Sequence, residues 1–562
     1  MSTQPDTQQG KPSEAPPPSV SRGNGGSTPA TAELPKAPAP SATPLAKGWP
    51  YTPHVVVFCS AACIMVVELV AGRLIGRHLG SSLYTWTSII GVILAGMSIG
   101  NYIGGRMADR WKPEHYVGFL FLASSVVCLS TLFLNHLFAV KEPFEAMRWP
   151  WRVFLSVLTI FTMPALVLGT ISPAMAKMAL ERSNAVGTTI GSVYAWATVG
   201  SIVGTLATGF YLIALLGAQG LVLTISLGLA LIGLAMGPMR WLHAIWVVAL
   251  GFGFYLAFSG SAFAMDKGYD FGLREESEHL FGTDSDYQYV KVYKEKSTKD
   301  KNREIHVMAL DYLIHGYVDI KDPTHLEYDY EKVYRDVARR MARGKKKVAS
   351  FFLGGGSYTF PRWVLHEWPG SRVEVAELDP MVLEANHAAM GLSRETPIKT
   401  YTMDARNAVD SLPRDAKFDL IFGDAFNDLS VPWHLTTVEF VRKLRAHLTP
   451  DGAYLANIIE DIRCGAFLGA TYNTLKKVFP HVVILCTEKE GISDGRETFV
   501  VAASNAPIQT SDWMPGHSSD FTGSVLTEQH LARLHKSSKG RVLTDDDSPV
   551  ENLLECVVRN RK

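Results

Sequence analysis

The segment VASFFLGGGSYTFPRWVLHEWPGSRVEVAELDP, residues 348–380, decides the fold of the C-terminal part of this chain. It holds two apolar runs of strand length, of which the first ends in three glycines and the second ends in acids. Similar apolar runs occur further along, at 418–426 and 453–460. Strands that alternate with helices form a mostly parallel sheet with helices on both faces. The pattern therefore predicts an α/β domain over residues 326–562.

Aromatic and β-branched residues fill the stretch before this domain. The runs YQYVKVYKE (287–295) and REIHVMALDYLIHGYVDI (303–320) are typical of short paired strands. We therefore expect a small antiparallel β domain over residues 267–325.

The N-terminal part is apolar enough for a membrane, since a helix that crosses a bilayer needs about 20 predominantly apolar residues. Seven stretches qualify, at 54–78, 84–106, 115–139, 152–180, 188–216, 218–237 and 241–264. We expect a transmembrane helical domain over residues 51–266. Residues 1–50 are rich in Pro, Ser, Thr, Ala and Gly, which predicts a disordered tail.

Charge and cysteine content exclude several classes of protein. The 562 residues include 54 Lys and Arg against 54 Asp and Glu, whereas nucleic-acid-binding proteins carry a basic excess. Six cysteines exclude a disulfide scaffold, and the lack of a CxxC pair argues against a zinc ribbon. We expect no nucleic-acid partner, no metal and no resident cofactor.

Acidic residues follow three successive strands of the predicted sheet. The first strand ends in Gly354, Gly355 and Gly356. Glu377 ends the next strand, at a spacing that suits an acid binding the two hydroxyls of a ribose. Asp404 can accept a hydrogen bond from an adenine amino group or simply cap a helix, and Asp424 follows the fourth strand. Without a GxGxxG motif no pyrophosphate is implied, so the pattern favours a nucleoside such as S-adenosylmethionine.

The order of these motifs resembles spermidine synthase and the wider polyamine aminopropyltransferase family. The matching pieces are DYQYVKVY (286–293), LDYLIHG (310–316), FFLGGGS (351–357), VAELDP (375–380), MDA (403–405) and DLIFGDAF (419–426). The apolar part resembles the multi-span spermidine synthase homologues of bacteria, with GGRMADR (104–110) and TISPAMAKMAL (170–180). The resemblance implies a Rossmann-like, class I methyltransferase-like catalytic domain in a bacterial inner membrane protein.

The resemblance also implies roles for individual residues of the nucleoside half of the site. The family's nucleoside-contacting Gln corresponds to Gln288, and its ribose acid corresponds to Glu377. Its adenine-contacting pair corresponds to Asp404 and Ala405, and the first acid of its active-site loop corresponds to Asp424. All of these residue types are present, so the adenosine half of the pocket is expected to be intact.

The other half of the motif set departs from the family. Ser357 stands where the family has the Asp that binds the aminopropyl ammonium, and His315 stands where it has a Gln. Asn427 replaces the second loop Asp, although Asp428 is adjacent. Buried cations without anionic partners are costly, so these losses argue against polyamine synthesis. They favour intact S-adenosylmethionine, whose carboxylate Ser357 and His315 are able to face.

The resulting hypothesis is a lyase that cleaves S-adenosylmethionine intramolecularly. Attack of the substrate carboxylate on its own γ carbon releases methylthioadenosine and homoserine lactone, with Asp424 and His315 as the catalytic residues. Alternatives are an aminopropyltransferase that uses Asp428, an N-methyltransferase, and a membrane protein that only senses a ligand. The family analogy suggests a homodimer, and a cytosolic substrate suggests a cytoplasmic catalytic domain.

Two charged features outside the motifs have competing interpretations. Glu68 and Arg73 lie near the end of the first span, either as a functional pair or as side chains that reach the interface. The basic run 339–347 is either a solvated face or a contact for anionic lipid.

Overall fold

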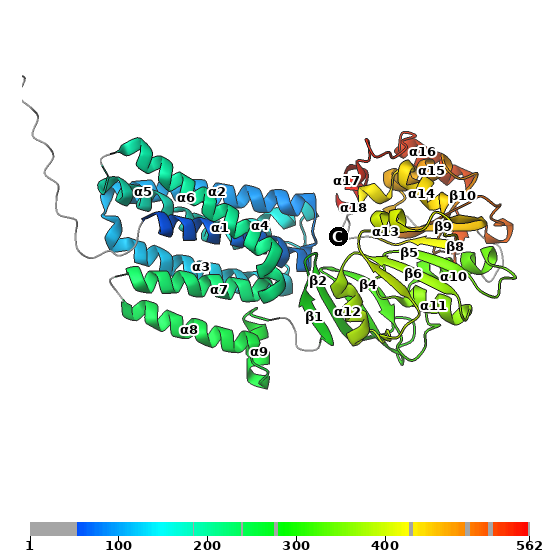
Figure 1. The fold of residues 1–562 in the computed structure, drawn as a ribbon, viewed down its shortest axis with the longest axis horizontal. Coiled ribbons are helices and arrows are strands. Elements are labelled where there is room, and N and C mark those ends of the chain that lie inside the picture. Colours follow the sequence, from blue (N-terminus) through cyan, green and yellow to red (C-terminus); the bar gives the residue numbers. More distant parts are fainter. Residues whose placement is uncertain are drawn as a thin grey trace, which may run out of the picture. The chain divides into compact units, whose positions relative to one another are not determined.

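The computed structural model describes residues 53–559, apart from 184, 238–239, 275–278, 426–430, 489–494 and 515–520. The expected tail lies outside the described residues. The described residues begin with helices and continue into two sheets (Figure 1).

Within the described residues up to Asp270, the chain forms nine α-helices. They are α1 (Pro53–Leu79), α2 (Leu83–Arg110), α3 (Pro113–Lys141), α4 (Trp149–Gly169), α5 (Ile171–Glu181), α6 (Val186–Ala207), α7 (Ile213–Met236), α8 (Arg240–Phe258) and α9 (Ala262–Asp270). Among the described residues, six continuous helical stretches are long and apolar enough to cross a membrane. Many of their large apolar side chains are exposed, as lipid-facing side chains would be.

We expected seven spans, whereas six helical stretches are long and apolar enough, because two of the expected spans are joined in one stretch with a break at Gly217. The stretch Val186–Met236 is counted as a single helix of 51 residues, yet it contains two of the expected spans. Gly217 interrupts it with non-helical backbone angles, φ 67° and ψ 167°. The residues before the break pack on α1, and those after it pack on α3. The last expected span was drawn too long, since α8 ends at Phe258 and α9 is a separate helix.

Glycines bring these helices into close contact, because a side chain at the same positions would clash. A Cβ on Gly100 would lie 2.2 Å from the carbonyl oxygen of Leu166 on α4. A Cβ on Gly200 would lie 2.3 Å from the carbonyl oxygen of Phe58 on α1. Small residues with this effect are typical of helix pairs in membranes.

A four-stranded antiparallel sheet follows, with strands in the order β1-β2-β3-β4. These strands are β1 (Phe281–Asp284), β2 (Tyr289–Lys296), β3 (Glu304–Leu310) and β4 (Leu313–Val318). Alternate side chains such as Val290, Val292 and Met308 are buried and share a core with Val382 of α12 (Pro380–Ala389). The sheet is thereby packed against a helix of the α/β domain.

The α/β domain is built on an eight-stranded sheet with the order β12-β10-β11-β9-β8-β5-β6-β7. Its strands are β5 (Ala349–Leu353), β6 (Arg372–Glu377), β7 (Lys399–Thr402), β8 (Phe418–Gly423), β9 (Leu448–Asp461), β10 (His481–Cys486), β11 (Arg496–Ser504) and β12 (Ser524–Val525). β5 to β9 pair in parallel, whereas β10, β11 and β12 pair antiparallel. The predicted Rossmann-like fold class is confirmed.

Helices cover both faces of this sheet (Figure 1). They are α10 (Asp329–Met341), α11 (Thr359–Glu367), α12, α13 (Ala405–Ser411), α14 (Val438–Ala446), α15 (Ala466–Lys476), α16 (Glu528–Ser537), α17 (Val550–Leu553) and α18 (Glu555–Arg559). Large aromatic side chains dominate one core, in which Phe352 of β5, Phe422 of β8 and Trp363 of α11 are buried. The parallel strands all end at one edge of the sheet, which is where ligands bind in open α/β sheets.

A disulfide joins Cys464, just after β9, to Cys556 in α18 across 92 residues. It holds the last helices against the domain. No spacing motif links these two cysteines in the sequence.

Candidate functional site

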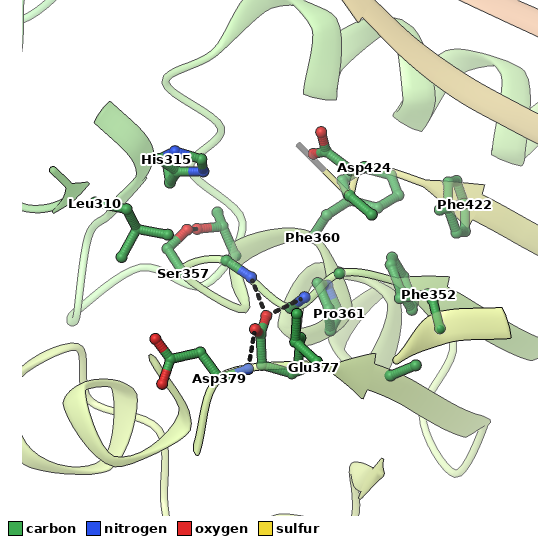
Figure 2. A pocket seen from close by; sticks show the side chains of 18 of the residues that line it. Leu310, His315, Phe352, Ser357, Phe360, Pro361, Glu377, Asp379, Phe422 and Asp424 are labelled. Atoms are coloured by element: carbon green, nitrogen blue, oxygen red, sulfur yellow. Dashed lines mark hydrogen bonds between the residues drawn. The ribbon is translucent and has the colours of Figure 1, made fainter. Parts of the chain in front are cut away.

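A pocket of about 160 Å³ lies at the carboxyl edge of β5, β6 and β8 and is closed on one side by the small sheet. Its lining includes ten of the twelve residues expected at the site: Gln288, His315, Gly354, Gly355, Gly356, Ser357, Glu377, Asp404, Ala405 and Asp424. Figure 2 shows His315 and Asp424 at one end and Glu377 and Asp379 at the other. The remaining two, Asn427 and Asp428, lie outside the described residues.

The glycine loop allows the strands to approach one another at the pocket floor. Gly354 has a φ of +96°, and a Cβ there would lie 2.3 Å from the carbonyl oxygen of Asp424. Gly356 also has a positive φ, of +48°. A side chain at position 354 would therefore both strain the backbone and push the loop away from β8.

Glu377 is buried at the end of β6 and binds the glycine loop. Its carboxylate accepts hydrogen bonds from the backbone N–H groups of Gly355 at 2.8 Å and Asp379 at 3.0 Å (Figure 2). Burial raises the pKa of this carboxyl, and the backbone hydrogen bonds partly offset the effect. Contact between Glu377 and a ribose stays a prediction.

Asp404 caps a helix and also binds a histidine. One carboxylate oxygen accepts from the backbone N–H groups of Arg406 at 2.9 Å and Asn407 at 3.2 Å, as an N-cap does. The other lies 2.8 Å from Nε2 of His434. Partial burial alone would raise the pKa of Asp404, but these hydrogen bonds lower it overall. Capping and adenine recognition are therefore not exclusive, and the adenine contact stays a prediction.

Ser357 and His315 are both less available to a carboxylate than the sequence suggested. The Ser357 and Thr359 hydroxyl oxygens are 2.6 Å apart, and Thr359 donates to the carbonyl of Tyr317, so Ser357 donates to Thr359. Burial lowers the pKa of His315 to about 4, so its imidazole is neutral at pH 7. That His315 faces a substrate carboxylate stays a prediction, and it would do so as a neutral imidazole.

Asp424 is held at the end of β8 by two side chains that the sequence analysis missed. Tyr330 of α10 donates to one oxygen at 2.8 Å, and Asn457 of β9 donates to the other at 2.9 Å. Burial raises the pKa of Asp424, and the two hydrogen bonds oppose that rise. A carboxylate with a raised pKa is suited to accepting a proton.

Glu331 is a second buried carboxylate in the same pocket, and the sequence analysis missed it. Its side chain is 3% exposed, and its Oε2 has no hydrogen-bond partner among the described residues. Burial, together with the nearby charge of Asp424, raises its pKa to about 8. The signal was present in the helical spacing, because Glu331 shares the buried face of α10 with Tyr334 and Ala338.

Other expected features have plainer explanations. Arg339 forms an ion pair with Glu367, and Arg340 binds Asp512 through two hydrogen bonds, so much of the basic run serves the domain itself. This arrangement favours the solvated-face interpretation over lipid contact. In the described part of the chain, His, Cys, Asp and Glu form no group of three that could hold a metal ion.

Several known proteins are similar in sequence to this chain. No family model matches the chain. A protein of Bifidobacterium longum named "Probable polyamine aminopropyl transferase" is 26% identical over 222 residues, which cover 36% of this chain and 48% of that protein. "Polyamine aminopropyltransferase 2" of Streptomyces coelicolor is 25% identical over 456 residues, covering 74% of this chain and 78% of that protein.

The resemblance to the polyamine aminopropyltransferases is confirmed. The aligned residues span about half the length of the Bifidobacterium relative, whereas the Streptomyces relative is matched over most of its length. Among solved structures, a probable spermidine synthase of Corynebacterium glutamicum aligns over 48% of this chain and 97% of its own, with 20% identity and a TM-score of 0.41.

Proposed function

We propose that this protein is a membrane-anchored enzyme that transfers an aminopropyl group from decarboxylated S-adenosylmethionine to an amine. The observation that carries the proposal is Glu331, a buried carboxylate with an unpartnered oxygen in the same pocket as Asp424. Two cationic groups meet in this reaction, the ammonium of the donor and the acceptor amine. Two carboxylates in one buried pocket supply the negative charge that such cations require.

Ser357 and Asn427 stand where the family has two acids, but Glu331 is a further carboxyl in the pocket that can take over the role of one of them. Ser357 leaves one side of the pocket uncharged, but Glu331 supplies a carboxyl from α10 instead. A bound ammonium would stabilise the ionised form of Glu331 and would therefore lower the pKa of this carboxyl from its value of about 8. The pocket is therefore able to hold a cation without the family's Asp at position 357.

In the proposed reaction an acceptor amine attacks the donor carbon next to the sulfonium. The new C–N bond forms as the C–S bond breaks, and methylthioadenosine leaves with the bonding electron pair. The attacking nitrogen must lose a proton, and Asp424 is the acceptor that the pocket offers. Gln288, Glu377, Asp404 and Ala405 are proposed to bind the nucleoside, which holds the reacting carbon in place.

Intramolecular cleavage of S-adenosylmethionine is the second candidate, and one observation favours it. Glu331, with its raised pKa, keeps its proton at neutral pH and is able to donate a hydrogen bond to a substrate carboxylate. Position 357 is an uncharged serine, which does not repel that carboxylate. The two candidates therefore require opposite protonation states of the same side chain.

A product assay by mass spectrometry on the detergent-purified full chain separates the candidates. One reaction contains S-adenosylmethionine alone, and the other contains decarboxylated S-adenosylmethionine with putrescine. Spermidine and methylthioadenosine in the second reaction support aminopropyl transfer. Methylthioadenosine with homoserine lactone in the first supports the lyase. In a third reaction, of S-adenosylmethionine with putrescine, S-adenosylhomocysteine and a methylated amine would indicate a methyltransferase.

We also propose that the catalytic domain faces the cytoplasm of a bacterial cell, because its nucleoside substrate is a cytosolic metabolite. Protease digestion of intact cells tests this placement. Cleavage within residues 270–562 from outside would contradict it.

A further inference from the structure

Asp284, the last residue of β1, connects the small sheet to two of the apolar helices. Its side chain is 5% exposed, and its Oδ2 accepts a hydrogen bond from Arg77 of α1 at 2.7 Å. The same oxygen accepts from the backbone N–H of Ala218 at 2.9 Å. Ala218 directly follows Gly217, where the helix is broken, so Asp284 caps the start of a new helical segment.

Helix α1 also holds the residues that follow Asp284. Arg73 donates to the backbone carbonyl of Asp286 at 2.5 Å. The guanidinium of Arg77 lies over the ring of Tyr289, 4.2 Å from its centroid. Arg73 is thus bound to the β1–β2 loop, and a functional pairing of Arg73 with Glu68 stays a prediction. The loop between β1 and β2 is anchored to α1 at both ends.

This anchored loop forms part of the pocket. Tyr287 and Gln288 line the pocket directly. Ser285 donates to Oδ2 of Asp379 at 2.5 Å, and the backbone N–H of Asp379 donates to Glu377 at 3.0 Å. These hydrogen bonds, joined by the peptide bond between Asp284 and Ser285, therefore connect the broken helix α7 to the carboxylate expected to bind ribose.

We propose that Arg77 and Asp284 are positioning residues, through which helices α1 and α7 fix the β1–β2 loop in its nucleoside-binding position. The inference rests on the proposed function to the extent that the pocket binds a nucleoside. The apolar helices then do more than anchor the enzyme, because nucleoside affinity depends on their contact with this loop. Neither residue touches the substrate, so their loss acts on binding and leaves the chemical step intact.

The test uses the full chain in detergent and methylthioadenosine as the probe. Asp284→Asn keeps an oxygen for the Ala218 N–H but removes the ion pair with Arg77. We expect its dissociation constant for methylthioadenosine to rise at least tenfold and KM to rise in parallel, with kcat within twofold of wild type. Arg77→Lys keeps the charge and should give a smaller rise, and it serves if Asp284→Asn does not fold.

Hydrogen–deuterium exchange gives a readout that needs no ligand. Peptides covering 285–289 should exchange faster in Asp284→Asn than in wild type. The matched control is Glu304→Gln, which removes an exposed ion pair to Lys294 in the same small sheet and should change neither measurement. Unchanged exchange and affinity in Asp284→Asn would overturn the inference. If the wild-type protein binds no nucleoside, the proposed function is contradicted. Hydrogen–deuterium exchange of the peptides covering 285–289 in Asp284→Asn would then test by itself whether Asp284 positions the loop.

Discussion

Glu331→Gln is the substitution that tests the proposed function most directly. At pH 7 a carboxyl with a pKa of about 8 is ionised in roughly one molecule in ten, and at pH 9 in roughly nine in ten. A cationic ligand that binds only the ionised form should therefore bind about tenfold more tightly at pH 9 than at pH 7. Glu331→Gln should abolish this pH dependence.

The loss of ligand affinity in Glu331→Gln can be calculated from the hydrogen bond that the substitution removes. A hydrogen bond to a charged group contributes about 1.5–3 kcal/mol, which corresponds to roughly a 10- to 150-fold change in affinity. We expect this loss at pH 9 for decarboxylated S-adenosylmethionine, measured by isothermal titration calorimetry. Methylthioadenosine has no ammonium, so its affinity should be the same in the variant and in wild type.

Stability should respond to pH with the opposite sign. The folded-state pKa of Glu331 lies above its ordinary value of 4.5, so the folded protein binds more protons than the unfolded chain between the two values. The free energy of unfolding then falls as pH rises from about 4.5 to about 8, by at most on the order of 5 kcal/mol. Glu331→Gln should remove this contribution in chemical denaturation, while the contributions of other buried carboxyls with a raised pKa, such as Glu460, should remain.

Glu460 offers a matched control, since burial also raises the pKa of this carboxyl, to about 7, but it is not among the pocket-lining residues. Glu460→Gln should alter the stability profile and leave the pH dependence of ligand affinity intact. The reasoning would be refuted if Glu331→Gln kept the tenfold pH dependence, or if it weakened methylthioadenosine as much as the charged nucleoside. Tighter binding of S-adenosylmethionine at low pH, lost in the variant, would favour the lyase.

Three further predictions concern other parts of the molecule. Gly354→Ala forces a φ of +96° on alanine and places its Cβ 2.3 Å from the Asp424 carbonyl oxygen, so unfolding in urea should show a loss of about 1–3 kcal/mol or more, together with lost nucleoside binding. Tyr330→Phe removes a donor to Asp424, so the acid limb of kcat/KM against pH should move up by about one pH unit; an unmoved limb would exclude Asp424 as the base. The Cys464–Cys556 disulfide should be reduced in intact cells if the domain faces the cytoplasm, as alkylation of both thiols before lysis would show, and a bridge that persists there would place the domain on an oxidising side.

The parts of the fold that follow from local pattern were predictable from the sequence. Apolar runs that end in glycine or acid became β5, β6 and β8, because a strand buried on both faces leaves a continuous apolar signature. The break between the expected spans 188–216 and 218–237 falls at Gly217, a residue able to adopt a positive φ without strain. Eight of the expected site residues came together because the carboxyl ends of parallel strands share one edge, whereas Gln288 and His315 reach the pocket from the small sheet.

What the sequence did not predict depends on contacts between distant segments. Glu331 belongs to an amphipathic helix whose buried face is visible in the sequence, but which pocket that face meets is set by the tertiary fold. The Asp284 contacts with Arg77 and Ala218 join residues 66 or more apart, and no local spacing encodes such a pair. The protonation state of His315 depends on its burial and so needed the fold as well.

The serine at position 357 does not determine the charge of the buried pocket by itself. Comparing motifs position by position counts acids along the chain, whereas a bound cation responds to every charge around it, at a strength that depends on distance and burial. Glu331 reaches the pocket from α10, so a carboxyl absent at one position is present at another. With a pKa of about 8, Glu331 is mostly protonated at pH 7 and becomes negatively charged mainly when a cation binds next to it. The pocket therefore distinguishes a donor with a free ammonium from one with a carboxylate. The choice between aminopropyl transfer and intramolecular cleavage is therefore a question about one proton on Glu331.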